Sequence, residues 1–188
     1  MSSTRSMPEI DQLTLARAAR RGDRAALAAV VERFGPAVHG LVARMLVGQP
    51  QRIDDTAQDA MVKVLDALPR FDPGGPARLS TWILTIATRT CIDRLRRPPR
   101  GEPLSPELPG VDSPEHAADQ RERFERVTRA MAALPAEQRA VLILRAYHDM
   151  DTAEIAAALE IEMGTVKSRL SRARAALRRA TGDEERGR

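Results

Sequence analysis

The chain has 188 residues, 43% of them hydrophobic but only 3% aromatic, with 30 basic and 26 acidic side chains and a net charge of +4. Cores of this composition are built from Ala, Leu, Val, Ile and Met, which is typical of helical bundles, so we expect an all-α fold. The single cysteine, Cys91, excludes an internal disulfide, and no apolar stretch reaches the roughly 18 residues of a membrane-spanning helix. The first residues lack the apolar segment of a signal peptide, and these features together predict a cytoplasmic protein that does not enter a membrane.

The N-terminal part of the sequence predicts a helical domain over residues 11–97, preceded by a disordered tail over residues 1–10. Its first clear helix follows an N-cap at Asp23, and Gly35-Pro36 predicts a kink or a break because proline removes a helical hydrogen bond. The apolar positions of this helix recur with a period of about 3.6 residues: Leu27, Val30, Val31, Phe34, Val38, Leu41, Val42 and Met45.

Two more helices are predicted in this domain. One begins at a capping-box pattern formed by Asp55 and Gln58 and ends at Pro69. The next covers residues 81–96 and has Ser80 as its N-cap. Trp82 lies in the apolar stripe of this helix, which favours core packing over a role in stacking on bases.

A proline-rich segment divides the chain. Residues 98–114 contain six of the thirteen prolines and no helical periodicity, so they predict a flexible linker. A second helical domain is expected over residues 115–182, followed by a tail over residues 183–188. The predicted fold is therefore two small helical domains on a flexible connection.

The charge is distributed unevenly along the chain. Residues 98–125 carry 3 basic and 7 acidic side chains. The flanking segments have the opposite sign, with 15 basic against 10 acidic residues over 1–97 and 12 against 9 over 126–188. Two basic blocks separated by an acidic spacer suit two contacts with a polyanion.

The C-terminal domain contains the pattern of a helix-turn-helix. A capping box at Asp151 and Glu154 opens a short helix, residues 160–162 form a turn, and a last helix covers residues 163–179. Six side chains of this last helix are basic and none is acidic. Solvated helix faces usually mix both signs, so a face of one sign favours contact with the phosphate-lined groove of DNA.

Three strings resemble one protein family. The string AALPAEQRAVLILRAYHDMDTAEIAAALEIEMGTVKSRLSRARAAL is similar to region 4 of the extracytoplasmic-function (ECF) sigma factors, small members of the sigma-70 family. Its most specific part is GTVKSRLSRAR. The strings IDDTAQDAMVKVLDALPRFD and LSTWILTIATRTCIDRLRR resemble region 2 of the same proteins, and the two blocks follow the order of the family with a linker between them.

The resemblance implies a role for named residues. The last helix is expected to read the −35 promoter element in the major groove through Lys167, Ser168, Arg169 and Arg172. The 81–96 helix and the loop before it are expected to hold the −10 element as single-stranded DNA, with charge from Arg78, Arg89, Arg94, Arg96 and Arg97. The polar side of the preceding helix is expected to bind the β′ clamp helices of RNA polymerase through Asp55, Gln58, Asp59 and Lys63.

The resemblance also implies partners and excludes chemistry. The partners are core RNA polymerase, contacted at the β′ clamp helices and the β flap, and promoter DNA, as a duplex at −35 and a single strand at −10. Many relatives are in addition held inactive by an anti-sigma factor. No catalytic residue, cofactor or metal site is expected, and the protein is not expected to be an enzyme.

Three residues depart from the family pattern. Glu160 stands at the turn position that usually holds glycine, so a residue with a side chain must adopt the conformation of the turn. Glu162 stands where the recognition helix usually has a serine cap. Arg89 stands where the family commonly has asparagine, which puts the −10 sequence preference in doubt.

Two other interpretations remain open. A free-standing helix-turn-helix regulator would explain residues 126–180 but would leave the N-terminal helices without a role, and such regulators are typically dimers on palindromic sites. An enzyme acting on DNA, such as a recombinase, would need a nucleophile with supporting arginines or a metal-binding carboxylate cluster.

Overall fold

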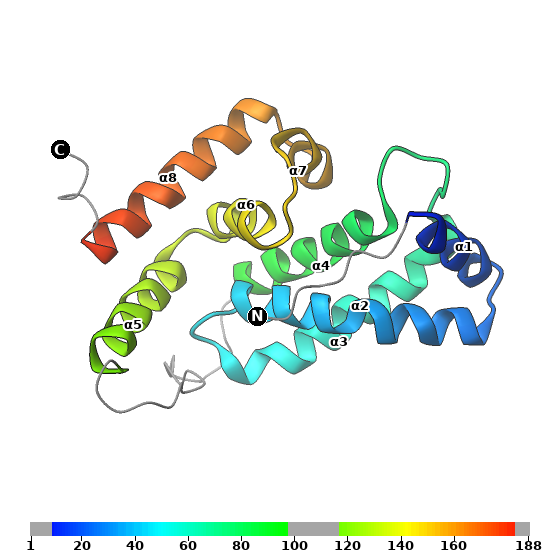
Figure 1. Cartoon of the computed structure of the whole chain (residues 1–188), viewed down its shortest axis with the longest axis horizontal. Coiled ribbons are helices and arrows are strands. Elements are labelled where there is room, and N and C mark those ends of the chain that lie inside the picture. Colours follow the sequence, from blue (N-terminus) through cyan, green and yellow to red (C-terminus); the bar gives the residue numbers. More distant parts are fainter. Residues whose placement is uncertain (1–8, 98–116, 183–188) are drawn as a thin grey trace.

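The computed structural model describes residues 9–97 and 117–182, and every regular element in these two ranges is a helix (Figure 1). The all-α prediction is confirmed. The helices of the N-terminal module, residues 9–97, are α1 (Glu9–Arg20), α2 (Arg24–Met45), α3 (Ile53–Ala67) and α4 (Leu79–Arg96), with the short 3-10 helices η1 (Pro50–Arg52) and η2 (Leu68–Arg70). Those of the C-terminal module, residues 117–182, are α5 (Ala117–Ala133), α6 (Ala136–Tyr147), α7 (Thr152–Leu159) and α8 (Met163–Thr181).

Helix α2 is the centre of the N-terminal module and packs against α1, α3 and α4. Asp23 caps it as predicted, because its carboxylate accepts hydrogen bonds from the backbone N–H groups of Ala25 and Ala26. The predicted apolar period forms the buried face of the helix: Ala26, Val30, Phe34, Val38, Leu41, Val42 and Met45. By length and composition alone α2 could cross a membrane, but here its apolar side is the core of a helical bundle.

Sequence analysis predicted a kink or a break at Gly35-Pro36, and the break is wrong, because α2 continues through Pro36 to Met45. Residues on both sides of the proline are fully or almost fully buried against α3 and α4. This packing outweighs the loss of one backbone hydrogen bond. The result is one 22-residue helix rather than two short ones.

Two other helix starts differ from the prediction. Helix α3 begins at Ile53, so Asp55 lies in its first turn and is not a cap, and Arg52 stands at the N-cap without a side-chain bond. Helix α4 begins at Leu79 with Arg78 at the N-cap, two residues before the predicted N-cap Ser80. Helix α1 was not predicted, and its first two residues fall within the segment expected to be a tail. Residues 1–8, the predicted linker 98–114 and the predicted tail 183–188 lie outside the described residues.

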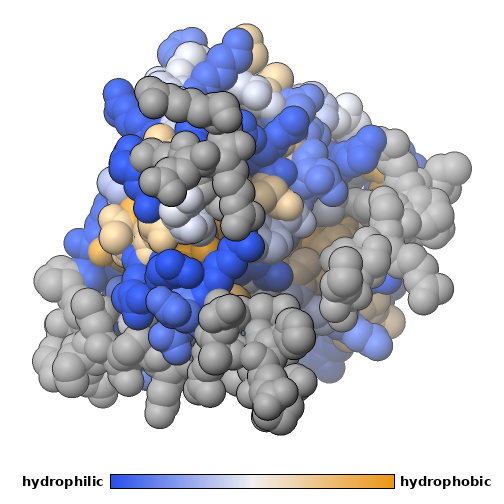
Figure 2. Space-filling model, turned by 60° about the vertical axis from the view of Figure 1, so that its left-hand side comes forward, coloured by the Kyte–Doolittle hydropathy of each residue, from blue (hydrophilic) through white to orange (hydrophobic). Residues whose placement is uncertain are grey.

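In the C-terminal module α8 packs against α5, α6 and α7, and α6 supplies more buried apolar residues than any other helix of the module. Five consecutive apolar residues of α6, from Ala140 to Leu144, are buried. The predicted last helix is confirmed and ends two residues later than expected, at Thr181, where Gly182 takes a positive φ of 72°. Large exposed hydrophobic residues come from five different helices, and hydrophilic side chains cover much of the face shown in Figure 2.

The two modules contact each other directly. Helix α6 packs against α2 and α4, and α7 packs against α4, so that α6 and α7 lie along α4 (Figure 1). The buried residues of both modules form one continuous hydrophobic cluster. Arg139 of α6 is only 4% exposed and donates hydrogen bonds to the carbonyl oxygen of Met45 at the end of α2 and to those of Ala132 and Leu134 in its own module.

Candidate nucleic-acid interface

The first helix of the helix-turn-helix, α7, begins with the capping box that the sequence predicted. The Asp151 carboxylate accepts from the Glu154 N–H at 2.7 Å, and the Glu154 carboxylate accepts from the Asp151 N–H at 2.8 Å, which closes the capping box. This pair fixes the point at which α7 begins. The opening of α7 is therefore set locally by two side chains, three residues apart.

The turn between α7 and α8 is strained at one residue. Glu160 has φ 55° and ψ 47°, the left-handed conformation that glycine adopts more easily. Its N–H donates to the last carbonyls of α7, and the N–H of Ile161 donates to Ala156 at 3.0 Å. Glu162 is the N-cap of α8, but its side chain makes no capping hydrogen bond. Both departures expected at this turn are therefore present, and the turn holds because its backbone hydrogen bonds are made.

Helix α8 has a buried side and a basic side. Val166, Leu170 and Ala173 are buried against the rest of the module. Five of the six basic residues of α8 are exposed, and only Arg169 is half-buried. The exposed ones are Lys167, Arg172, Arg174, Arg178 and Arg179. The helix therefore offers positive charge to the solvent along its length.

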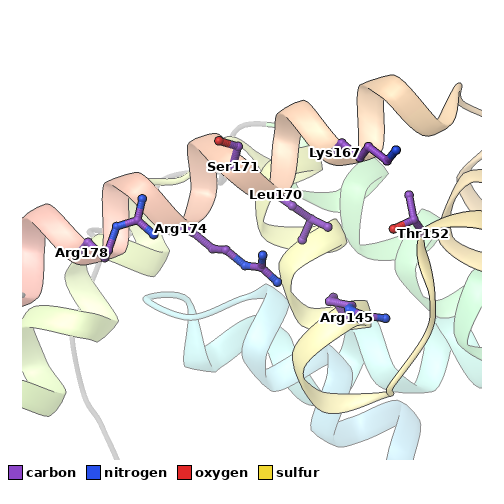
Figure 3. A pocket seen from close by; sticks show the side chains of 7 residues that line it. All are labelled: Arg145, Thr152, Lys167, Leu170, Ser171, Arg174 and Arg178. Carbon is purple, nitrogen blue, oxygen red and sulfur yellow. The ribbon is translucent and has the colours of Figure 1, made fainter. Parts of the chain in front are cut away.

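A cavity of about 400 Å³ opens beside α8 (Figure 3). Four of its lining residues recur at intervals of four, three and four along one side of α8: Lys167, Ser171, Arg174 and Arg178. Leu170 forms part of its wall, Arg145 comes from α6, and Thr152 comes from the first turn of α7. Four cationic side chains and two hydroxyls line the cavity and no carboxylate does, which matches a bound anion such as a DNA phosphate.

The four residues expected at −35 do not share one face. Lys167 lines the cavity, whereas Arg172 is exposed but lies five residues further along, about 140° around the helix. Ser168 is half-buried, and its hydroxyl donates to the carbonyl oxygen of Thr165 at 3.0 Å. Arg169 is half-buried and lies close enough to Glu137 of α6 for its charge to act on that carboxyl.

The lowered pKa of the Glu137 carboxyl identifies the groups around it. Its pKa is lowered first by a hydrogen bond from Arg96 and further by its own backbone N–H and by the charges of Arg96 and Arg169. Arg169 therefore faces its own domain rather than the open side of α8. The sequence pattern missed Arg145, Thr152, Ser171, Arg174 and Arg178 as a group, although the i, i+4, i+7, i+11 spacing on α8 was available as a signal.

The five arginines expected at −10 are spread over α4. Arg78 stands at its N-cap, and Arg97 follows its last residue. Because α4 has 18 residues, these two ends are roughly 27 Å apart. Arg94 is half-buried beside Arg52, whose guanidinium donates to the Arg94 carbonyl at 2.9 Å. The pKa of Arg52 is lowered by burial and by the nearby charge of Arg94.

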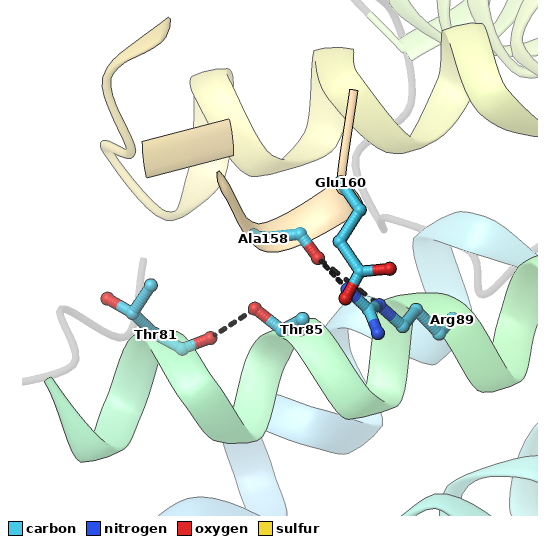
Figure 4. A network of polar contacts seen from close by, with 5 residues as sticks. All are labelled: Thr81, Thr85, Arg89, Ala158 and Glu160. Carbon is cyan, nitrogen blue, oxygen red and sulfur yellow. Dashed lines mark hydrogen bonds and ion pairs between the residues drawn. The ribbon is translucent and has the colours of Figure 1, made fainter. Parts of the chain in front are cut away.

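The two remaining arginines are held by the C-terminal module. Arg89 donates through Nε and Nη2 to the carbonyl oxygen of Ala158, at 3.2 Å and 2.8 Å, and pairs with the Glu160 carboxylate at 2.9 Å (Figure 4). Arg96 pairs with Glu137 at 2.9 Å. Trp82 packs at 5.1 Å, ring to ring, against the buried Phe71, which agrees with the core role predicted for it.

The residues expected to bind polymerase form one exposed group on α3. Asp55, Gln58 and Asp59 lie on the side opposite the buried Thr56, Ala60 and Val64. Lys63 continues this side and reaches toward the Thr90 hydroxyl of α4 at 3.4 Å. The four side chains are therefore available on one surface of the N-terminal module.

Both modules match models of known protein regions. Residues 30–100 match Sigma-70 region 2, and residues 124–177 match Sigma-70, region 4. SigW of Bacillus subtilis, an ECF RNA polymerase sigma factor, is 30% identical over 177 residues, which cover 87% of this chain and 93% of SigW. RpoE of Cereibacter sphaeroides, another ECF sigma factor, is 35% identical over 164 residues, 85% of this chain and 89% of RpoE. The ECF sigma-E factor of Escherichia coli K12 is 31% identical over 180 residues, 89% of this chain and 92% of that factor.

Two solved structures share the fold. CnrH in complex with the cytosolic domain of CnrY is 27% identical with a TM-score of 0.65, covering 92% of this chain and 98% of CnrH. The sigma factor RpoE of Bartonella quintana, in complex with the anti-sigma factor NepR, is 22% identical with a TM-score of 0.66, covering 84% and 97%. With both regions matched in order and relatives of this identity covered almost end to end, the chain belongs to the ECF sigma factors of the sigma-70 family.

Proposed function

We propose that the chain directs core RNA polymerase to promoters with −10 and −35 elements and catalyses no reaction itself. The observation that carries this proposal is the presence of both regions in one chain, with an all-basic α8 in the second and an exposed polar α3 surface in the first. A free-standing regulator would need only the second region. We also propose that the protein works in the cytoplasm, where polymerase and promoter DNA are found.

At −35, α8 lies in the major groove of the duplex. Arg172 and Lys167 are exposed and extend from α8, and Arg suits bidentate contact with guanine. A backbone phosphate fits the cavity between Arg145, Arg174 and the Thr152 hydroxyl, because the cavity carries positive charge and hydroxyl donors. The base contacts then give sequence preference, and the phosphate contact fixes the position of the helix on the DNA.

At −10, the N-terminal module holds a single strand. The basic residues of α4 attract the backbone, and binding energy alone favours the strand-separated form of the element. Arg78 and Arg97 are exposed at the two ends of the helix and are free to contact DNA without a rearrangement of the modules. Arg89 and Arg96 are engaged by the C-terminal module and require one.

The polymerase contact is the exposed side of α3. Asp55, Gln58, Asp59 and Lys63 meet the β′ clamp helices, and the C-terminal module meets the β flap. Residues 98–114 connect the two modules across the polymerase. CnrH and the Bartonella RpoE were both solved with a protein bound, the latter with an anti-sigma factor, and we propose that an anti-sigma factor controls this chain as well.

In vitro transcription tests the proposal. Core polymerase is combined with the chain and a pool of promoter fragments, and the transcripts are sequenced. We expect start sites that share −10 and −35 motifs, and no transcripts from core polymerase alone. Tight, sequence-specific duplex binding by the chain without polymerase, together with no transcription, would support the free-standing regulator instead.

A further inference from the structure

The cavity beside α8 carries more positive charge than one DNA phosphate balances. Its cations are Arg145, Lys167, Arg174 and Arg178, and none of its lining residues is acidic (Figure 3). Within residues 9–97 and 117–182, none of these four side chains forms an ion pair. A phosphate group of the DNA backbone carries a single negative charge. Three of the four cations therefore remain unbalanced when one such group occupies the cavity.

The cavity has the size of a small-molecule site. Its volume of about 400 Å³ lies within the range of roughly 300–1,000 Å³ that such sites have. Its walls come from α6, from the first turn of α7 and from α8. Along α8 the charged side extends from Lys167 to Arg178, about 16 Å at the rise of an α-helix. A chain of linked phosphates would contact more of this length than one phosphate does.

Two guanidinium groups from different helices face this space. Arg145 of α6 donates through Nη1 to the carbonyl oxygen of Met150 at 3.0 Å, which fixes the position of its guanidinium. Figure 3 shows the Arg174 side chain extending from α8 toward α6, the helix that carries Arg145. Guanidinium groups bind phosphate oxygens bidentately, and the hydroxyls of Thr152 and Ser171 add further donors. The cavity can therefore hold several phosphate oxygens at once.

The lining of the cavity favours phosphate over any group attached to it. Leu170 is its one apolar residue, and no aromatic side chain lines it. A nucleotide base would find no ring to stack on. A terminal phosphate, in contrast, carries a charge of about −1.5 to −2 at pH 7, more than a phosphate within a DNA strand. The chemistry of the lining is therefore that of an oligophosphate site.

We propose that this cavity binds a free oligophosphate anion, either the triphosphate of a nucleotide or an inorganic chain, and that the anion competes there with the DNA backbone. Binding of the anion follows from the cavity alone. The competition rests on the −35 role proposed above, in which a backbone phosphate enters the same cavity. Oligophosphate would thus weaken the contact that positions α8 on the duplex and leave the base-reading side of the helix free.

Titration calorimetry of the full chain with inorganic tripolyphosphate, without magnesium, tests the binding. We expect one site, weakened at least about tenfold by Arg174→Glu, which removes charge-assisted hydrogen bonds and adds repulsion. Ser171→Glu, at a second exposed position of the lining, should act in the same direction. The matched control is Arg179→Glu, which makes the same charge change on α8 about 100° around from Arg178 and outside the cavity.

The control should change the affinity by less than about threefold, and circular dichroism should show similar melting for all variants, because the changed residues are exposed. Absence of saturable binding, or equal loss in Arg174→Glu and Arg179→Glu, would overturn the proposal.

ATP and adenosine distinguish the sources of the anion. ATP should bind within about threefold of tripolyphosphate, and adenosine should not bind, since the lining offers nothing to a base. Much weaker binding of ATP would assign the site to inorganic chains alone. Saturable binding of adenosine, or a preference of more than about tenfold for ATP over tripolyphosphate, would overturn the assignment of phosphate as the recognised group.

A fluorescein-labelled duplex pool with a randomised centre tests the competition. At about ten times its dissociation constant, tripolyphosphate should weaken duplex binding by the wild type about tenfold more than sodium chloride of the same ionic strength. This excess should be lost in Arg174→Glu and kept in Arg179→Glu. Equal effects of the two salts on the wild type would overturn the competition. Failure of the proposed function is read separately, as absence of transcription by the wild-type chain with core polymerase.

Discussion

Arg139 is a buried guanidinium whose replacement by methionine should destabilise the protein by about 2–4 kcal/mol. The side chain is 4% exposed and no carboxylate pairs with it in the described residues. Its burial lowers its pKa. Its Nη1 and Nη2 atoms donate to the carbonyl oxygens of Met45, Ala132 and Leu134, whereas its Nε is buried without a hydrogen-bond partner in the described residues. Hydrogen bonds from a charged donor contribute about 1.5–3 kcal/mol each, and the cost of removing the guanidinium from water offsets a large part of their sum.

Arg139→Met keeps the volume and helix propensity but leaves three carbonyls without this donor. For a chain of this length the loss corresponds to a fall in melting temperature of about 5–15 °C by circular dichroism. Arg139→Lys should fall in between, because a compact ammonium group cannot reach three carbonyls in different directions. Gln138→Met, one position earlier on α6, is the control and should change little. If the free energy of unfolding of Arg139→Met lies within about 0.5 kcal/mol of the wild type, the buried guanidinium does not stabilise the fold, and this reasoning is wrong.

Three other perturbations have defined outcomes. Burial, and next the charge of Arg44, lower the pKa of His148 from 6.5 to about 4. Because the unfolded chain therefore takes up a proton at a higher pH than the folded chain, the free energy of unfolding should fall by about 1–3 kcal/mol as the pH drops from 6.5 toward 4. Urea titrations across this range should show the slope in the wild type and a flatter profile between pH 6.5 and 5 in His148→Gln. Arg172→Ala should weaken binding to −35 duplexes by about 1–3 kcal/mol and relax the preference at one base, whereas Arg174→Ala should weaken binding to all duplexes evenly and lower the salt slope of the affinity by about one. Unchanged base preference of the Arg172→Ala holoenzyme in footprinting would show that Arg172 does not read the DNA. Gln58→Ala with Asp59→Arg should change the free energy of unfolding by no more than about 0.5 kcal/mol but should abolish binding to core polymerase in a pull-down. Retained binding would show that this surface of α3 does not contact polymerase.

The sequence predicted those parts of the fold that depend on neighbours in the chain. The Asp23 cap, the Asp151–Glu154 capping box and the buried period of α2 all follow from residues within one or two turns of each other. A local rule predicted a kink or a break at Pro36, and the break is wrong, because packing against α3 and α4 keeps the helix continuous. Helix α3 starts at Ile53, two residues before its predicted cap Asp55, and Ile53 packs against the hydrophobic core.

The candidate site was predictable only in part. The positive charge of α8 could be read directly from the sequence, but the cavity needs Arg145 and Thr152 from two other helices. Arg89 and Glu160 are 71 positions apart, and no periodicity connects them. Their contact depends on how the two modules pack, which local propensity does not determine.

The charge on α8 gives salt two opposite effects. Its six basic side chains repel one another in the free protein, since no acidic residue of the helix offsets them. Added salt screens this repulsion, so the isolated fold should gain stability as ionic strength rises. The same salt competes with the protein for phosphates and weakens its complex with DNA. Under the function proposed above, α8 is least stable in the free protein at low ionic strength, where its complex with DNA is tightest, and the DNA phosphates neutralise its positive charge.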